Sequence, residues 1–527
     1  MYYIIIVFLT FLQTLWALGS MNFPVEVLSP AMVRVCCNYL LPPMLLFCPL
    51  LFTRRRRWTY VVSLLLDVWF IGNLIYFRSY GDVLSRWCLD SAGNMNGLWS
   101  SVIPFVHASD IVILLITAVW IIISELTALP HLFAQLRWRT AVTVGFAAML
   151  CIPQAITARQ TETPVCPFAT FYDDVSMGRL WYTYTYGPLT HFCNETVNYL
   201  RDHETPPEPL TDDELAPYLQ TPDSTLTPCG NILFVLFESL EDWTIGLRVG
   251  GEEVTPCLNR LAAHPHTGTY PMTAQVRQGK SSDARLICLN GLLPIYNGAT
   301  AMRYASNTYP SWVTAMPART KQCFTASQRH IWNQERNTYA YGFDYLFAEA
   351  VSDAVLVDSV LHAVRTAERP FVLATYTMAS HAPFIDYADS AALPADNTFD
   401  DEKRRYLNCV HYTDSVLGIL IDEVLNDREL ADNTRIIILG DHPVFDMDTP
   451  VPFIFYDPFE TPAAVSRTLY QMDIYTTVTD RLHLPAAWHG LGRNIADTCA
   501  CTQQQLRDLE VLSDRLIRTD YFSKQHN

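Results

Sequence analysis

Apolar residues are concentrated in five runs near the N-terminal end of the chain, and short polar segments separate these runs. The runs cover Tyr2–Leu18, Met32–Phe52, Trp58–Phe77, Ile103–Leu126 and Ala141–Ile156. Each run is close to the roughly 20 apolar residues that a helix needs to cross a lipid bilayer. A cleaved signal peptide would explain only the first run. The pattern therefore predicts a transmembrane domain of about five helices at residues 1–160.

Arginines between the apolar runs indicate how these helices are oriented. Four arginines, Arg54 to Arg57, lie between the second and third runs, and Arg137 and Arg139 lie between the fourth and fifth. Short loops rich in positive charge stay on the cytoplasmic side of a membrane. With an odd number of spans, the chain after about residue 157 is then expected to be extracytoplasmic.

The pattern changes after the last apolar run. Residues 161–228 are mixed in character, become rich in Pro, Asp and Thr, and are interpreted as a juxtamembrane linker. In residues 229–527, short apolar strands alternate with amphipathic helices. The predicted strands are "NILFVLF" (231–237), "RPFVLATYTM" (369–378), "TRIIILG" (434–440) and "VPFIFYDP" (451–458). This alternation predicts an α/β domain whose sheet is mostly parallel and is covered by helices on both faces.

Charge and cysteine content narrow the function classes. The formal net charge is -17, and no basic tract is longer than the four arginines named above, which argues against nucleic acid as a partner. The 14 cysteines do not show zinc-ribbon spacing. Most are interpreted as small buried residues. One or two disulfides remain open for an extracytoplasmic domain.

Polar residues directly follow three of the predicted strands. Glu238 follows the first strand, His381 lies just after the second, and Asp441 and His442 follow the third. Ligands of open α/β sheets bind at the carboxyl ends of the strands, so these side chains are expected to gather at one edge. Together with Ser281, the two carboxylates and His442 would offer three oxygens and one nitrogen to a divalent cation.

Ser281 lies in "QVRQGKSSDARLICLNGLLP" (275–294) and is the predicted nucleophile. A serine hydroxyl reacts poorly at neutral pH, but a divalent cation lowers its pKa and polarises a phosphoryl oxygen. The same segment is expected to begin a helix, with Ser282 or Asp283 as its cap and its first amides near a phosphate. Lys280 and His381 are expected to stabilise phosphoryl oxygens.

In these motifs, their order and their spacing, the chain resembles the lipoteichoic acid synthase branch of the alkaline phosphatase and sulfatase superfamily. The matching segments are "NILFVLFES" (231–239), "QGKSSDA" (278–284), "IWNQ" (331–334), "YGFDYLF" (341–347), "SHAPF" (380–384), "VHYTDSVLG" (410–418) and "LGDH" (439–442). The resemblance implies metal ligation by Glu238, Ser281, Asp441 and His442, with serine where the family usually has threonine. It also implies that His381 and Trp332 contact the substrate.

Two positions depart from the family pattern. Gln334 stands where the family has an arginine, and Thr325-Ala326 stands where it has His-Gly. A neutral amide cannot replace the positive charge, so another cation is expected to compensate. The nearest candidates in sequence are Arg329, His330 and Arg336.

The resemblance implies a multi-pass enzyme of the bacterial cytoplasmic (inner) membrane that transfers a phosphoglycerol-type headgroup through a phospho-Ser281 intermediate. The donor is expected to be a membrane phospholipid, and the acceptor a glycan, glycolipid or polymer. Manganese is the expected cation, while magnesium and zinc remain open.

Four other activities would use the same site. They are phosphoethanolamine transfer, phosphodiester hydrolysis, sulfate-ester hydrolysis and headgroup binding without catalysis. Asp283 occupies the position where the formylglycine signature of sulfatases has proline or a small residue, which disfavours sulfate-ester hydrolysis even though Ser281 and Arg285 match its ends. The complete ligand set disfavours a catalytically silent receptor.

Overall fold

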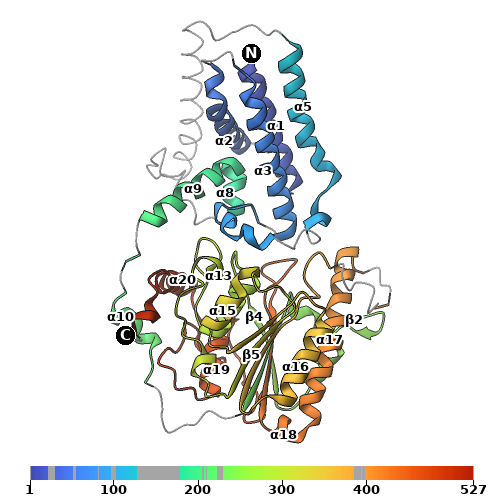
Figure 1. Cartoon of the computed structure of the whole chain (residues 1–527), viewed down its shortest axis with the longest axis vertical. Helices are drawn as coiled ribbons and strands as arrows, with labels where there is room; N and C mark the ends of the chain where they lie inside the picture. Colours follow the sequence, from blue (N-terminus) through green and yellow to red (C-terminus); the bar gives the residue numbers. More distant parts are fainter. Residues whose placement is uncertain are drawn as a thin grey trace. The chain divides into compact units, whose positions relative to one another are not determined.

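The computed structural model describes residues 2–21, 30–51, 55–80, 82–95, 102–127, 179–204, 207–208, 210–221, 230–384, 393–394 and 398–525. The chain divides into two compact units, which are described separately (Figure 1). One unit is helical and comprises Met1–Leu89 and Gly97–Thr205. The other is an α/β unit that comprises Asp90–Asn96 and Pro206–Asn527.

Three helices in the described part of the helical unit are long and apolar enough to cross a membrane. These candidate spans are Tyr2–Ser20, Trp58–Ser79 and Ala108–Leu126. They correspond to α1 (Tyr2–Ser20), α3 (Trp58–Tyr80) and α5 (Ile111–Leu126). The unit also contains α2 (Pro30–Phe47), η1 (Cys48–Leu51), the first four residues of η2 (Arg86–Met95), η3 (Ile103–Phe105), η4 (Ala108–Asp110), α8 (Arg179–Tyr186) and α9 (Pro188–Glu204).

The five predicted spans are therefore only partly accounted for. The second apolar run forms α2 and η1, and Pro42 and Pro43 lie inside α2. Proline removes a helical N–H and disturbs the preceding turn. The apolar part of this region, Asn38–Leu51, is shorter than the three candidate spans. The fifth run, Ala141–Ile156, lies outside the described residues.

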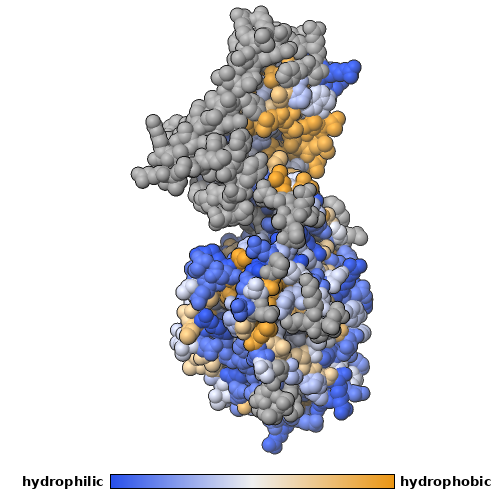
Figure 2. All heavy atoms as spheres, turned by 90° about the vertical axis from the view of Figure 1, so that its left-hand side faces the viewer, coloured by the Kyte–Doolittle hydropathy of each residue, from blue (hydrophilic) through white to orange (hydrophobic). Residues whose placement is uncertain are grey.

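Apolar side chains lie on the outside of the helical unit as well as in its interior. Val61, Leu65 and Val68 on α3, and Ile122 and Leu126 on α5, are exposed. Figure 2 shows a hydrophobic area on this unit, whereas the visible face of the α/β unit is mostly hydrophilic. Large exposed apolar areas are unfavourable in water and mark a membrane or protein contact. The exposed side chains therefore agree with a lipid-facing surface.

Several polar contacts join the candidate spans, among them those of Asp67 and Asp110. The Asp67 carboxylate on α3 accepts hydrogen bonds from Gln13 Nε2 on α1 and from Thr117 Oγ1 on α5, each at 2.8 Å. Arg78, near the end of α3, pairs with Asp110 at 2.7 Å, where α5 begins. Polar groups inside a membrane bundle are stabilised when they face one another between helices.

The α/β unit is built on an eight-stranded sheet in the order β10-β4-β9-β8-β1-β7-β5-β6. The strands are β1 (Asn231–Phe237), β4 (Thr267–Thr273), β5 (Thr320–Thr325), β6 (Tyr345–Ala348), β7 (Phe371–Tyr376), β8 (Thr434–Gly440), β9 (Val451–Tyr456) and β10 (Leu469–Tyr470). Strands β8, β1, β7, β5 and β6 are parallel, and β9 runs antiparallel to β8 and β4. The expected mostly parallel sheet is confirmed.

Helices cover both faces of this sheet. The main helices are α11 (Pro256–Ala262), α12 (Ser281–Asn290), α15 (Gln334–Ala340), α16 (Asp353–Thr366), α17 (Asp401–Asn426), α19 (Asp473–Arg481) and α20 (Gln503–Arg518). The shorter elements are α10 (Asp212–Leu215), η7 (Ala216–Tyr218), η8 (Asp242–Thr244), β2 (Arg248–Val249), β3 (Glu252–Glu253), α13 (Thr300–Arg303), α14 (Trp312–Ala315), η9 (Ile331–Asn333), α18 (Arg428–Ala431) and η10 (Tyr521–Gln525).

Strand β1 shows why the central strands are apolar throughout. Alternate residues such as Ile232 and Phe234 belong to one hydrophobic core, and Leu233 and Val235 belong to the other. Side chains of a strand point alternately to its two faces, so a strand between two helical layers needs apolar residues at every position. The polar residues that follow β1 and β8 therefore mark the points where these strands leave the core.

Candidate active site

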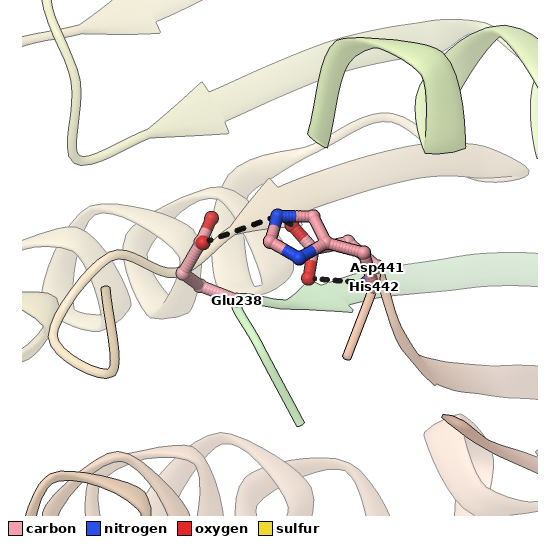
Figure 3. Close-up of side chains that lie close together, drawn as sticks. All are labelled: Glu238, Asp441 and His442. Atoms are coloured by element: carbon pink, nitrogen blue, oxygen red, sulfur yellow. Dashed lines mark hydrogen bonds and ion pairs between the residues drawn. The ribbon is translucent and has the colours of Figure 1, made fainter. Parts of the chain in front are cut away.

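The site begins where two neighbouring parallel strands end. Phe237, the last residue of β1, is in register with Gly440, the last residue of β8. Glu238 and Asp441 therefore leave the sheet side by side, with His442 next in the chain. One ligand atom from each of these three side chains lies within 4.8 Å of the other two. Figure 3 shows the three side chains converging from the two strand ends.

Ser281 adds a hydroxyl to this group from the first residue of α12. Its Oγ donates to Glu238 Oε2 at 3.1 Å and lies 3.4 Å from His442 Nε2. The side chain is half-buried, so it can be reached from solvent. The structure thus brings together all four residues that the sequence suggested as cation ligands.

The hydrogen bonds of Asp441 and His442 leave one possible ligand atom on each side chain available to a cation. Asp441 Oδ1 accepts from the backbone N–H groups of Ser239 and His442 at 2.6 and 2.7 Å, while Oδ2 is buried and has no donor among the described residues. His442 Nδ1 donates to Pro443 O at 3.0 Å, which leaves the lone pair on Nε2. That Nε2 lies 3.6 Å from Asp441 Oδ2 and 3.8 Å from Glu238 Oε1.

The electrostatics of the site agree with this fit. Burial raises the pKa of Glu238 well above its ordinary value, and the neighbouring charge of Asp441 raises it further. Burial also lowers the pKa of His442, while the neighbouring charge of Asp441 acts in the opposite direction. Two adjacent buried carboxylates are costly without a positive partner. A divalent cation would supply that charge, and oxygen ligands with one imidazole suit such an ion.

Asp283 holds the loop before α12 through hydrogen bonds to its backbone, and it does not cap the helix. Lys280 occupies the N-cap position with φ +46° and makes no side-chain cap bond. Asp283 Oδ2 accepts from Arg277 N and Gly279 N, each at 2.9 Å, and Ser282 Oγ donates to Gly279 O at 2.6 Å. The expected side-chain cap is therefore replaced by bonds that run back into the loop.

These bonds also change the expected role of the first helical amides. Ser282 N donates to Gly279 O, and Asp283 N donates to Lys280 O. Both amides are thus already used within the loop. A Cβ at Gly279 would lie 2.2 Å from Asp283 Oδ1, so only glycine fits this close approach. Asp283 and Gly279 together fix the backbone that presents Lys280 and Ser281.

We predict that Asp283→Ala makes the amides of residues 277 and 279 exchange with solvent about 10- to 100-fold faster. The substitution leaves two N–H groups without their acceptor, which costs about 1–3 kcal/mol for a buried group. Hydrogen exchange of the peptide spanning residues 275–294, followed by mass spectrometry, measures this directly. Asp358→Ala, at an exposed position of α16, is the control and should leave this peptide unchanged. Unchanged exchange in the Asp283 variant would contradict the anchoring role.

His381 and Trp332 lie on loops that follow neighbouring strands. His381 is exposed after β7, and its Nδ1 donates to Ala382 O at 2.6 Å. Trp332 lies in η9, after β5, with φ +53°, and the next residue, Asn333, has φ +48°. Asn337 Nδ2 donates to the carbonyls of these two residues at 2.8 and 3.1 Å. Left-handed backbone at bulky residues is strained and is often found at functional sites.

The arginine that contacts Gln334 in the structure is Arg285, which was not among the candidates that the sequence suggested. Gln334 is 1% exposed, and its Oε1 accepts from Arg285 Nη1 at 2.8 Å. Arg329 is exposed and pairs with Glu335 at 3.0 Å. Sequence reasoning treated Arg285 only as part of a sulfatase signature. Its position four residues after Ser281, on the same helical face, is the signal that could have identified it.

Comparisons with known proteins agree with this geometry. Residues 1–177 match the lipoteichoic acid synthase N-terminal domain family, and residues 230–484 match the sulfatase family. A lipoteichoic acid synthase-like protein of Bacillus subtilis, YvgJ, is 24% identical over 416 residues, which is 74% of this chain and 65% of that protein. The lipoteichoic acid synthase of Staphylococcus aureus is 24% identical over 421 residues, which is 73% of this chain and 62% of that protein.

The matched part is thus slightly less than two thirds of the length of these relatives. Among solved structures, the integral membrane lipooligosaccharide phosphoethanolamine transferase A of Neisseria meningitidis has a TM-score of 0.56 at 13% identity. The match covers 92% of this chain and 98% of that one, and it shows a shared fold. The chain thus carries a lipoteichoic acid synthase N-terminal domain at residues 1–177 and a sulfatase-family domain at residues 230–484, and over about three quarters of its length it is similar to lipoteichoic acid synthases.

Proposed function

We propose that this protein is a membrane-anchored, metal-dependent phosphotransferase. It would move a phosphoglycerol-type headgroup from a membrane phospholipid to a glycan, glycolipid or polymer acceptor. The observation that carries this proposal is the hydroxyl of Ser281, 3.1 Å from Glu238 Oε2 and beside Asp441 and His442. The names of the relatives, which are lipoteichoic acid synthases, support the same reaction class.

The first half-reaction forms a phosphorylated serine. A divalent cation held by Glu238, Asp441 and His442 would lower the pKa of the Ser281 hydroxyl and polarise a phosphoryl oxygen. Ser281 Oγ gives up its proton and attacks the phosphorus, the bond from phosphorus to the diacylglycerol oxygen breaks, and that oxygen takes up a proton. We expect Lys280 and His381 to stabilise the phosphoryl oxygens during this step.

The second half-reaction restores the enzyme. A hydroxyl of the acceptor attacks the phosphorus, the bond to Ser281 Oγ breaks, and the serine regains its proton. The headgroup has then moved from the lipid to the acceptor. With water as the acceptor, the same two steps would give a phosphodiesterase.

The helical unit would keep the enzyme next to its lipid donor. Its three candidate spans are apolar outside, as expected for a membrane anchor. The arginines near residue 55 favour a cytoplasmic position for the loop before α3. We place the α/β unit on the extracytoplasmic side of the bacterial cytoplasmic membrane.

The proposal is tested with the purified full-length protein and vesicles that contain phosphatidylglycerol. In the presence of Mn²⁺ we expect diacylglycerol release and a glycerophosphoryl group on Ser281, detected by mass spectrometry. Mg²⁺ and Zn²⁺ are compared in the same assay. Phosphoethanolamine on Ser281 from phosphatidylethanolamine vesicles would favour the ethanolamine transferase instead. Binding of both lipids without any release would favour a silent receptor.

A further inference from the structure

The side chain of Arg285 stands out because of where it begins and what it touches. It lies four residues after Ser281 in α12, so the two residues share one helical face, separated by about 6 Å along the axis. Helical side chains lean towards the N-terminus, which for Arg285 is the Ser281 end. The guanidinium lies 4.2 Å from the centre of the Tyr376 ring and donates to Gln334.

Tyr376 ties this guanidinium to the edge of the sheet that holds the site. Tyr376 ends β7 and is in register with Leu236 of β1. Glu238 follows Leu236 by two residues, and its backbone N–H donates to Thr377 Oγ1 at 3.0 Å. Arg285 therefore lies against the end of β7, the strand next to β1, which Glu238 directly follows.

Arg285 is half-buried, and it lacks the acidic partner that two more deeply buried arginines have. Arg435 and Arg467 pair with Asp457 and Asp473 at 3.1 and 2.7 Å. In the described part of the chain, Arg285 makes no ion pair, and its buried Nε has no hydrogen-bond partner. Burying a charge without a counter-charge or full hydrogen bonding is costly. A ligand that accepts hydrogen bonds and carries no positive charge would satisfy this group.

We propose that Arg285 binds the headgroup of the lipid donor and selects glycerol over ethanolamine. The proposal rests on the proposed transferase function and names the substrate class for it. Arginine offers five N–H donors, of which Gln334 takes one. Nε is buried, so the hydroxyl oxygens of a glycerol headgroup would accept from the remaining N–H groups of Nη1 and Nη2. The ammonium of ethanolamine has no acceptor to offer, and its charge repels the guanidinium.

The test compares Arg285→Gln, Arg285→Lys and Arg285→Glu in the full-length protein. Diacylglycerol release is measured from phosphatidylglycerol vesicles and from phosphatidylethanolamine vesicles. We expect Arg285→Gln to lower kcat/KM for phosphatidylglycerol roughly 10- to 100-fold, the range for hydrogen bonds to a charged group, without lowering it for phosphatidylethanolamine. Arg285→Lys should keep most of the preference, and Arg285→Glu should shift it towards phosphatidylethanolamine. Arg365→Ala is the matched control, because Arg365 pairs with Glu423 on an exposed surface.

An equal loss with both donors, or an unchanged ratio between them, would overturn the proposal and leave Arg285 with a structural role only. A shift in the ratio caused by Arg329→Ala instead would overturn it as well. Calorimetric binding of glycerol phosphate and of phosphoethanolamine to full-length Ser281→Ala protein gives an answer that does not depend on turnover. There, Arg285→Gln should weaken glycerol phosphate binding roughly 10- to 100-fold and leave phosphoethanolamine binding no weaker. Failure of the wild-type protein to release diacylglycerol from either lipid would count against the transferase function, and this binding comparison would still decide the role of Arg285.

Discussion

Replacing Ser281 with alanine is expected to lower diacylglycerol release from phosphatidylglycerol vesicles by about 1000-fold or more. The substitution removes the only atom of that side chain that can attack phosphorus, and loss of a nucleophile costs at least this much in comparable covalent mechanisms. Little strain is introduced, because Ser281 begins α12 and alanine is a good helix former. The glycerophosphoryl group on residue 281 should disappear from the mass spectrum of the same sample.

The neighbouring serine provides a matched control. Ser282 is buried and its hydroxyl donates to Gly279 O, so Ser282→Ala removes a structural hydrogen bond and keeps the nucleophile. We expect phosphorylated Ser281 to persist in that variant. Ser281→Thr should retain part of the activity, because the hydroxyl remains. Full activity in Ser281→Ala would remove Ser281 from the mechanism.

The centre of the sheet could be predicted because its strands carry a strong local signal. β1, β7, β8 and β9 are apolar at nearly every position and fully buried. Strands that are covered on both faces are recognised by such continuous runs. The polar residues directly after two of these strands then locate the site, since parallel strands bring their carboxyl ends to one edge.

The outer strands carry a weaker signal. β4 has the sequence "TGTYPMT", contains glycine and proline, and alternates between buried and exposed positions. β6 has only four residues, and both β5 and β6 are partly exposed. Glycine and proline are depleted in strands, so their presence argues against one. These segments become strands because they pair with strands that are distant in sequence, as β4 does with β9. Such pairing cannot be predicted from the local sequence pattern.

Within the site, the contacts of Arg285 likewise could not be predicted from the local sequence. Arg285 contacts Gln334 and Tyr376, which are far away in sequence and come from different elements. The sequence suggested cations close to Gln334 in the chain, but Arg329 instead pairs with Glu335. Helical spacing from Ser281 was available as a signal, whereas the position of Gln334 relative to α12 depends on the tertiary fold.

Cation affinity should depend strongly on Asp441 and on pH. Metal ligands must be deprotonated to bind, so binding competes with protons. Burial and the charge of Asp441 raise the pKa of Glu238. Protons therefore compete with the cation for Glu238 at a higher pH than they would for an ordinary glutamate. We therefore expect Mn²⁺ affinity to fall as the pH is lowered towards that raised value, and to recover when the pH is raised again.

Asp441→Asn is expected to weaken Mn²⁺ binding by at least about 100-fold, because even residues that only support a metal ligand contribute 10- to 100-fold. One oxygen of Asp441 accepts two backbone N–H groups, and the other is buried beside His442, where no residue in the described part of the chain donates to it. An amide cannot keep both roles, since its NH₂ group would face either the N–H donors or the cation. Calorimetric titration of the full-length protein with Mn²⁺, and the metal content after dialysis, measure the loss. Asp446→Asn, at an exposed position in the following loop, is the control and should bind as the wild-type protein does. Equal Mn²⁺ affinity in the Asp441 variant and the wild type would show that the cation does not bind at the ends of β1 and β8.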